Sequence, residues 1–238
     1  MVALALSTIV VGAVQATATD GPVVVADWQM NELQSDDTMA DSSGNGITAS
    51  LDGLSVIRNG AYYDFNEADK PNKAIAPEHI VRVPHTDALN PGTGTYAVEF
   101  RYRTDRPYGN IVQKGQAGAR GGYWKFQLPQ GEVSCLFRGP SGSNSVRYQD
   151  YKDYGNGVTG RLDDDEWHTV RCERFFDKRG EGLRMYVDGQ YVGINRGNTG
   201  VLANREPVYI GGKGFCNQVT ITCDYFGGEI DWVRIERP

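Results

Sequence analysis

The sequence predicts an all-β domain made of many short strands joined by tight turns. Runs rich in β-branched and aromatic residues recur along the 238 residues, and Gly, Pro, Asn or Asp separates nearly every pair of runs. Glycine accounts for 30 residues, well above its ordinary share of about 7%. No long stretch shows a helical period, so we expect little helix.

Twelve runs have the composition of strands. In chain order they are 23–30, 61–65, 79–84, 95–104, 110–115, 123–129, 132–139, 145–151, 167–175, 183–194, 207–212 and 226–236. In the run 95–104, Tyr96, Val98, Phe100 and Tyr102 alternate with polar or small residues, which predicts a strand with one face in the core and the other in water.

The run 183–194 predicts a hairpin. Its centre is Asp188-Gly189, a preferred pair for a two-residue turn because both central positions need positive φ. Three further side chains are expected in or beside the core. In the run 167–175 we expect Trp167 to be a core residue with His168 beside it, and in 123–129 we expect Trp124 to point inward.

Charge and composition narrow the function. The chain has 24 Lys and Arg against 30 Asp and Glu, a net charge of −6, so it lacks the positive field on which non-specific nucleic-acid binding depends. With 39% hydrophobic and 23% charged residues, it fits one soluble globular domain and excludes collagen, coiled coils and multi-pass membrane proteins.

The first residues have the pattern of a secretory signal peptide. An apolar stretch covers 3–14, and Ala16-Thr17-Ala18 supplies the small residues that a signal peptidase accepts. A core strand or a membrane anchor is the alternative, but the stretch is shorter than the roughly 20 residues that a span needs. We expect residues 1–18 to be the signal peptide, 19–238 to form a single domain, and the protein to be secreted.

Four cysteines fit an exported protein, because an even count there usually means disulfides. Three pairings are possible. Cys135 and Cys172 both lie inside strand-like runs, whereas the short segment between Cys216 and Cys223 can turn back on itself, so we predict 135–172 and 216–223. A zinc site is disfavoured, since there is no C-x-x-C and there are only three His.

Five motifs in order carry a family resemblance. They are WQMNE at 28–32, DSSGNG at 41–46, EWHTV at 166–170, LRMYVDGQYVG at 183–193 and GEIDWVRI at 228–235. Together they resemble the laminin-G-like jelly rolls of the concanavalin A-like lectin/glucanase superfamily, from about Val24 to Ile235. The resemblance implies a jelly-roll sandwich of two antiparallel sheets, with the two ends of the chain side by side.

The same resemblance implies a structural calcium ion. DSSGNG offers oxygen atoms of the kind that calcium prefers. The first and last strands of the family lie together, which would bring Asp231 near Asp41, so Asp41, Asn45 and Asp231 are the expected ligands. The alternative is that Asp41 and Asn45 only build an Asx turn and that Asp231 accepts hydrogen bonds from buried amides.

A catalytic site is less well supported. Glucanases of this superfamily use E-x-D-x-x-E on one strand, but Arg234 stands where the second Glu should be and cannot protonate a glycosidic oxygen. The shorter E-x-D-x-E pattern also fails, at Val233. Arg101, Arg103, His79 and the many Tyr residues could in principle supply a polysaccharide lyase, but no recognised spacing joins them.

Two regions are candidates for binding a sugar. The long connection 139–160 contains Arg147, Tyr148, Tyr151 and Tyr154, whose flat rings and polar groups suit a carbohydrate. The alternative is that Tyr148 lies in the core and that Tyr151 and Tyr154 cover a sheet edge. The second region is Tyr108 with Tyr123 and Trp124.

We therefore expect a secreted module that recognises an extracellular polysaccharide or other glycan, or a cell-surface partner, stabilised by calcium and without catalysis. We expect no nucleic-acid partner and no membrane span. The alternatives are a polysaccharide-degrading enzyme, lyase or glycoside hydrolase, on the same jelly roll, and a purely structural interaction module. The fold by itself does not choose among them.

Overall fold

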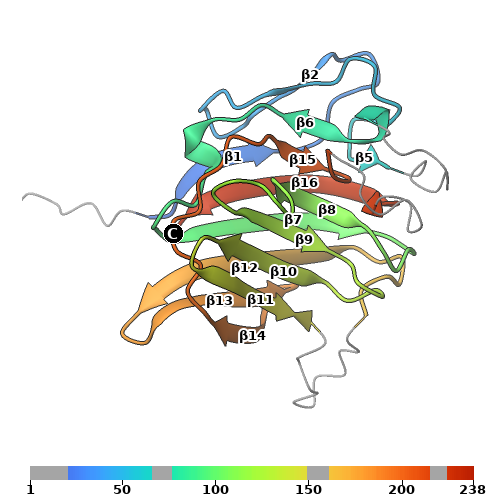
Figure 1. Cartoon of the computed structure of the whole chain (residues 1–238). Coiled ribbons are helices and arrows are strands. Elements are labelled where there is room, and N and C mark those ends of the chain that lie inside the picture. The colour runs from blue at the N-terminus through green and yellow to red at the C-terminus, as the bar shows by residue number, and fades with distance from the viewer. Residues whose placement is uncertain (1–20, 66–76, 149–160, 215–223) are drawn as a thin grey trace, which may run out of the picture.

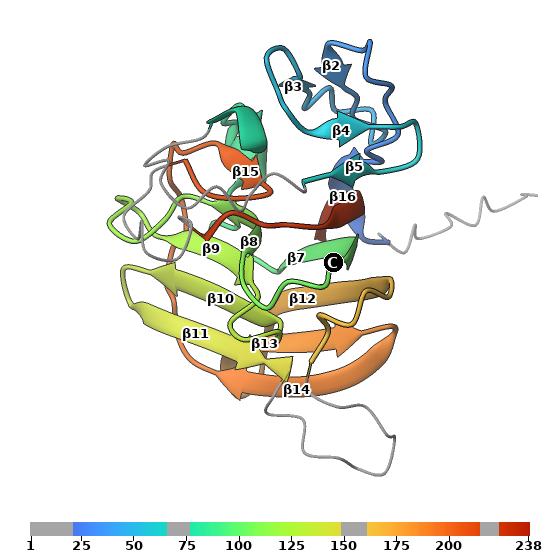
Figure 2. The same ribbon diagram turned by 90° about the vertical axis from the view of Figure 1, so that its right-hand side faces the viewer.

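The computed structural model describes residues 21–65, 77–148, 161–214 and 224–238. These residues form two antiparallel sheets that pack face to face (Figure 1). The view in Figure 2 separates the layers, with β9, β10 and β11 in one and β12, β13 and β14 in the other. The predicted all-β jelly-roll sandwich is confirmed, and the described helix consists of two short 3-10 turns, Pro77–His79 and Asp87–Leu89.

The larger sheet has eight strands. Their order is β14 (Gln190–Arg196), β13 (Gly180–Val187), β12 (His168–Asp177), β7 (Tyr96–Arg103), β16 (Glu229–Arg237), β5 (Tyr63–Asp64) and β4 (Ile57–Arg58), and β1 (Val23–Trp28) also pairs with β16.

The smaller sheet has six strands, in the order β11 (Gly142–Arg147), β10 (Ser134–Gly139), β9 (Tyr123–Gln127), β8 (Asn110–Lys114), β15 (Val208–Ile210) and β6 (Val81–Val83). A separate pair is formed by β2 (Thr38–Met39) and β3 (Ala49–Ser50).

The first and last described strands are neighbours. Val23 pairs with Arg237 and Trp28 with Val233, antiparallel, with one irregularity of register between Val24 and Ala26. Figure 1 shows β1 running beside β16. The expected adjacency of the two ends therefore holds for these strands. The predicted signal peptide, residues 1–18, lies outside the described residues and stays a prediction.

Alternation along β7 builds the core as expected. Tyr96, Val98, Phe100 and Tyr102 are fully buried, and Tyr96 and Phe100 contact aromatic residues of the six-stranded sheet. The Phe100 and Phe126 rings, for example, meet edge to face at 5.2 Å between centroids. Trp124 is also fully buried. Each such side chain contributes about 1.5–3 kcal/mol of hydrophobic stabilisation, so this layer is what holds the two sheets together.

The expectation that Trp167 lies in the core is wrong. Val170 and Cys172 of β12 point inward, and alternation from them directs Trp167 to the outer face of the eight-stranded sheet. Its partly buried ring lies under the guanidinium groups of Arg101 and Arg103, at 4.8 and 5.1 Å from the ring centroid. His168 instead bridges two carboxylates at the end of the sheet, Asp188 at 2.8 Å and Asp164 at 3.0 Å.

The predicted hairpin is confirmed. Asp188 and Gly189 have φ values of 49° and 76°, and the flanking residues Val187 and Gln190 pair across the turn. Both central φ values are positive, as a two-residue turn between strands of right-handed twist requires.

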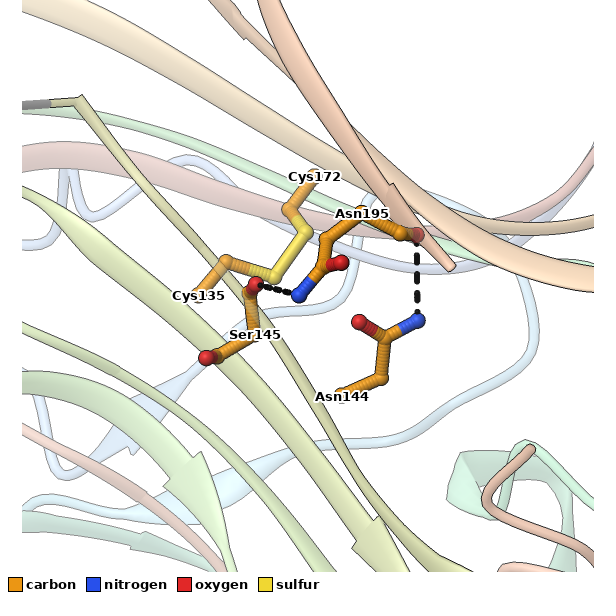
Figure 3. The surroundings of a disulfide bond; sticks show 5 residues. All are labelled: Cys135, Asn144, Ser145, Cys172 and Asn195. Atoms are coloured by element: carbon orange, nitrogen blue, oxygen red, sulfur yellow. Dashed lines mark hydrogen bonds between the residues drawn. A yellow bond between two sulfur atoms is a disulfide. The ribbon is translucent and has the colours of Figure 1, made fainter. Parts of the chain in front are cut away.

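The predicted disulfide Cys135–Cys172 is also confirmed (Figure 3). It joins β10 to β12 and therefore ties one sheet to the other, with 6.4 Å between the Cα atoms. Close by, the Asn144 side-chain amide donates to the Asn195 carbonyl at 3.1 Å, and the Asn195 amide donates to the Ser145 carbonyl at 2.9 Å. Cys216 and Cys223 lie outside the described residues, so the second pairing stays a prediction.

Within the described part of the chain, no helix has the length and apolar character needed to cross a membrane.

Candidate functional site

A hollow of about 470 Å³ opens on the outer face of the six-stranded sheet, where β8 begins and β9 ends. We refer to it as the β8–β9 pocket. The side chains that give it its chemistry are Tyr108, Asn110, Lys125, Gln127, Glu132, Arg147 and Asp224.

Strand register brings these residues together from distant parts of the sequence. Phe126 is in the core, so its neighbours on β9, Lys125 and Gln127, point outward. Gln127 pairs with Asn110 on β8 and with Ser134 on β10, which pairs with Arg147 on β11. One row across four strands therefore places Asn110, Gln127 and Arg147 on the same face.

The rim of the pocket depends on Gly109. This residue has a φ of 149°, and a Cβ added to it would lie 2.8 Å from the Phe226 Cα, so only glycine fits. Its carbonyl accepts a hydrogen bond of 2.8 Å from the Leu128 amide. The preceding residue, Tyr108, lines the pocket and has 51% of its surface exposed.

The polar side chains of the pocket differ in whether they have hydrogen-bond or ion-pair partners. Asn110 is 1% exposed, and its buried Oδ1 has no hydrogen-bond partner among the described residues. Lys125 donates to the Gln127 Oε1, and burial lowers the pKa of its ammonium group because a low dielectric disfavours the charged form. Asp224 is paired with Lys213 at 2.6 Å. The pocket therefore offers amide groups, an aromatic ring and cations to a ligand.

Of the residues predicted to bind carbohydrate, Arg147 lines this pocket and is exposed. Tyr148 is 1% exposed and lies in the core, as the alternative interpretation expected. Tyr151 and Tyr154 lie outside the described residues. Of the second predicted region, Tyr108 reaches the pocket, whereas Trp124 points inward.

Asn110, Lys125 and Gln127 were not predicted as site residues from the sequence. A signal for two of them was present, because Lys125 and Gln127 alternate with the apolar Trp124 and Phe126 in one short run. What was missing was the pairing of β9 with β8 and β10, which decides their neighbours.

The residues expected to bind calcium are held by other partners. The Asp41 carboxylate accepts backbone hydrogen bonds from Asp27, Ser43 and Ile47 at 2.9–3.0 Å. The Asn45 amide donates to the carbonyls of β1, at 3.0 Å from each of Val24 and Val25.

Asp231 forms an ion pair with Arg101 at 2.5 Å. No cluster of three or more His, Cys, Asp or Glu side chains that could hold a metal occurs among the described residues. These contacts fit the Asx-turn alternative better than an ion shared by Asp41 and Asp231, and calcium binding stays a prediction.

The groups considered for catalysis are also engaged elsewhere. Glu229, like Asp231, is ion-paired with an arginine of β7, in its case Arg103. His79 lies in a different region, with its Nδ1 at 2.9 Å from the Ser55 Oγ and its ring tilted against that of Tyr225. The described residues therefore do not gather these arginines and His79 around one point.

Comparison with known proteins agrees with the fold. The family model described as the concanavalin A-like lectin/glucanases superfamily matches residues 78–237. No sequence of a curated protein matches the chain.

Three solved structures illustrate the similarity. The binding domain of Paraclostridial Mosquitocidal Protein 1 has 14% identity and a TM-score of 0.63 over 90% of this chain and 48% of its own. The receptor binding domain of botulinum neurotoxin mosaic serotype C/D has 12% identity and a TM-score of 0.56 over 90% and 46%. Domains LG4-5 of the mouse laminin alpha1 chain have 19% identity and a TM-score of 0.51 over 74% and 41%.

The chain spans less than half the length of each of these structures, and at these identities the similarity concerns the fold. The family model, in contrast, covers most of the sequence, and the two-sheet architecture agrees with it. The chain belongs to the concanavalin A-like lectin/glucanase superfamily, as a laminin-G-like domain.

Proposed function

We propose that this chain is a carbohydrate-binding module of an extracellular protein and that the glycan binds in the β8–β9 pocket. The observation that carries the proposal is the composition of the pocket. A half-exposed tyrosine ring lies at its mouth, and side-chain amides and cations from neighbouring strands line it.

This set of groups suits a sugar. A pyranose ring has an apolar face that can stack on an aromatic ring such as that of Tyr108, whose hydroxyl stays in water. The hydroxyls of the sugar can exchange hydrogen bonds with Gln127 and Asn110, since a primary amide both donates and accepts. Asn110 has an added reason to bind, because a buried amide oxygen without a hydrogen-bond partner is unfavourable.

One structural relative supports the same direction. Botulinum neurotoxin type C, with 12% identity and a TM-score of 0.54, is described as depending on interaction with two ganglioside molecules to get into cells. This relative shows by analogy that a fold of this kind can carry a glycan site. The residues of the β8–β9 pocket support the proposal directly.

Binding without catalysis and secretion are parts of the same proposal. The carboxylates considered for glycoside hydrolysis, Glu229 and Asp231, are both held by arginines, whereas hydrolysis needs one of two carboxyl groups to be protonated. A disulfide between the sheets is typical of oxidising compartments, which supports an extracellular protein.

A glycan array with the purified, disulfide-intact protein tests the proposal, followed by calorimetry on the strongest ligand. We expect Tyr108→Ala to weaken binding at least roughly tenfold, since stacked aromatic groups are typical anchors. Tyr191→Ala is the matched control, because Tyr191 is also half exposed, at 50%, but lies on β14 of the other sheet.

An array without any ligand, or equal losses in the two variants, would refute the proposal. Release of reducing ends or of unsaturated sugars from the bound polysaccharide would instead establish the enzymatic alternative.

A further inference from the structure

The two sheets differ sharply in charge. The strands of the eight-stranded sheet carry nine acidic residues and nine arginines. The strands of the six-stranded sheet carry no Asp or Glu at all, and their charged residues are all cations: Arg82, Lys114, Lys125, Arg138 and Arg147. The chain as a whole has a net charge of −6, so an excess of basic residues in the sequence does not explain why this sheet carries only cations.

The two cations that line the β8–β9 pocket, Lys125 and Arg147, face few carboxylates among the described residues. Neither Lys125 nor Arg147 forms an ion pair with any described residue, although both belong to well-formed strands. Asp224 is already neutralised by Lys213 at 2.6 Å. Glu132 at the rim is therefore the single unpaired carboxylate that the described lining sets against these two cations.

The two cations are placed to act on one ligand. Lys125 and Gln127 point to the same face of β9, and Gln127 is in register with Arg147 two strands away. Strands are spaced by about 4.8 Å and residues along a strand by about 3.4 Å, so the backbone of Lys125 lies roughly 12 Å from that of Arg147, a span that two long side chains can close on a small anion. An arginine fork matches the paired oxygens of a carboxylate or sulfate, and a lysine supplies a compact point charge.

We propose that the glycan bound by this domain is acidic and that its carboxylate or sulfate group lies between Lys125 and Arg147. This inference rests on the proposed function and adds the chemical class of the ligand. Tyr108, Asn110 and Gln127 then contact the sugar ring and its hydroxyls, so the site selects an anionic saccharide over a bare anion.

The test uses an array that carries neutral glycans together with their uronic, sialylated and sulfated counterparts. Each ligand found is then measured in two forms, as the acid and after methyl esterification of its carboxylates or removal of its sulfate. We expect the ligands to be acidic and the neutralised form to bind at least tenfold more weakly. The two treatments also distinguish a carboxylate from a sulfate.

Two variants locate the charge effect in the pocket. Arg147→Gln and Lys125→Gln should each lose at least tenfold in affinity for the acid and little for its neutral form, while Arg147→Lys should retain part of the binding. Lys178→Gln is the control, since it changes the net charge equally and removes an exposed cation from the turn between β12 and β13.

The outcomes are distinguishable. Neutral ligands on the array, or equal affinity for the two forms, would overturn the inference and leave the proposed function standing. Binding of poly-L-glutamate as tight as that of the glycan would overturn selection for a saccharide. A blank array would remove the proposed function together with the inference.

Discussion

The two outer faces of the sandwich show how one fold can use charge in two ways. On the eight-stranded sheet, Asp27, Arg234, Glu99 and Arg171 form a row of alternating sign across β1, β16, β7 and β12. On the six-stranded sheet the corresponding row, from Asn110 to Arg147, contains no acidic residue.

On the outer face of the eight-stranded sheet, charged side chains form ion pairs with one another. Asp27 and Arg234 are 2.9 Å apart, and Arg171 reaches Glu236 at 2.7 Å and Glu99 at 3.2 Å. Asp27–Arg234 and Arg171–Glu99 join neighbouring strands, and Arg171–Glu236 reaches across β7, so these charges stabilise the sheet. On the second face, that of the six-stranded sheet, Lys125 and Arg147 have no ion-pair partner in the part of the chain that the structure describes. Ion pairs between strands therefore distinguish the two outer faces. On the eight-stranded sheet the charges stabilise the fold, whereas on the six-stranded sheet we propose that the cations bind a ligand.

The largest effect is expected from removing the disulfide that links the two sheets. Replacing both cysteines, Cys135→Ala with Cys172→Ala, should lower the free energy of unfolding by about 4 kcal/mol, because the bridge closes a loop of 37 residues in the unfolded chain. Guanidinium denaturation of the variant and of the oxidised wild type measures the difference. A loss below about 1 kcal/mol would show that core packing alone holds the sheets together.

The next largest effect should come from the neutralised face. Arg171→Gln leaves Glu99 and Glu236 without their cation at positions that are mostly buried, which should lower the free energy of unfolding by about 3 kcal/mol. Glycan affinity should not change. Lys178→Gln, on an exposed turn, is the stability control and should stay within about 0.5 kcal/mol of wild type. Loss of glycan binding in Arg171→Gln without loss of stability would reverse the roles of the two faces.

A smaller effect is expected at the loop that packs on β1. Asp41→Ala should cost about 2 kcal/mol, because three backbone amides lose a charged acceptor. Burial alone would raise the pKa of Asp41, but these hydrogen bonds outweigh burial and hold the pKa below its usual range. The contribution is therefore present above about pH 4 and is lost as the pH falls through the lowered pKa, so the deficit of the variant should shrink in acid.

The same variant tests calcium. We expect Asp41→Ala to be less stable than wild type by a similar amount in excess calcium and in chelator. A melting temperature of the wild type that falls in chelator and returns with calcium, with no such response in Asp41→Ala or Asp231→Ala, would instead support the calcium site implied by the family resemblance.

The smallest effect is expected from placing an acidic residue on the outer face of the six-stranded sheet, so that it resembles the outer face of the eight-stranded sheet. Leu136 is half buried on the outer face of β10, directly opposite Lys125. Leu136→Glu would give that lysine a cross-strand partner and should weaken binding of an acidic glycan up to roughly fivefold, with a change in stability below about 1 kcal/mol. Leu136→Gln has the same shape without the charge. Equal affinity of these two variants would argue against an electrostatic role for Lys125.

Local features of the fold were predictable from the sequence. The alternation along Tyr96–Arg103 and the Asp188-Gly189 turn are properties of consecutive residues, and the structure confirms both. Trp167 was placed wrongly because it comes just before its strand begins, where neighbouring residues do not define the face. Only the inward positions of Val170 and Cys172 determine that the ring points outward.

The pocket was less predictable because only the pairing register of the strands brings its residues together. Arg147 and Tyr108 were identified from residue type, but Asn110, Gln127 and Arg147 come together only through three pairings between strands. The charge pattern has the same origin. The cations can be counted in the sequence, but that they share a sheet without acidic residues follows from the strand order.

The pairing of Val23 with Arg237 has a mechanical consequence. Any segments that continue the chain beyond these residues leave the domain from a single corner, so tension between them pulls on two adjacent antiparallel strands from the same end. Such a load opens the backbone hydrogen bonds of β1 one after another, as in unzipping, instead of shearing them all at once. Under tension the domain would therefore yield first by peeling away β1, at low force, while the disulfide-bonded half of the sandwich stays intact.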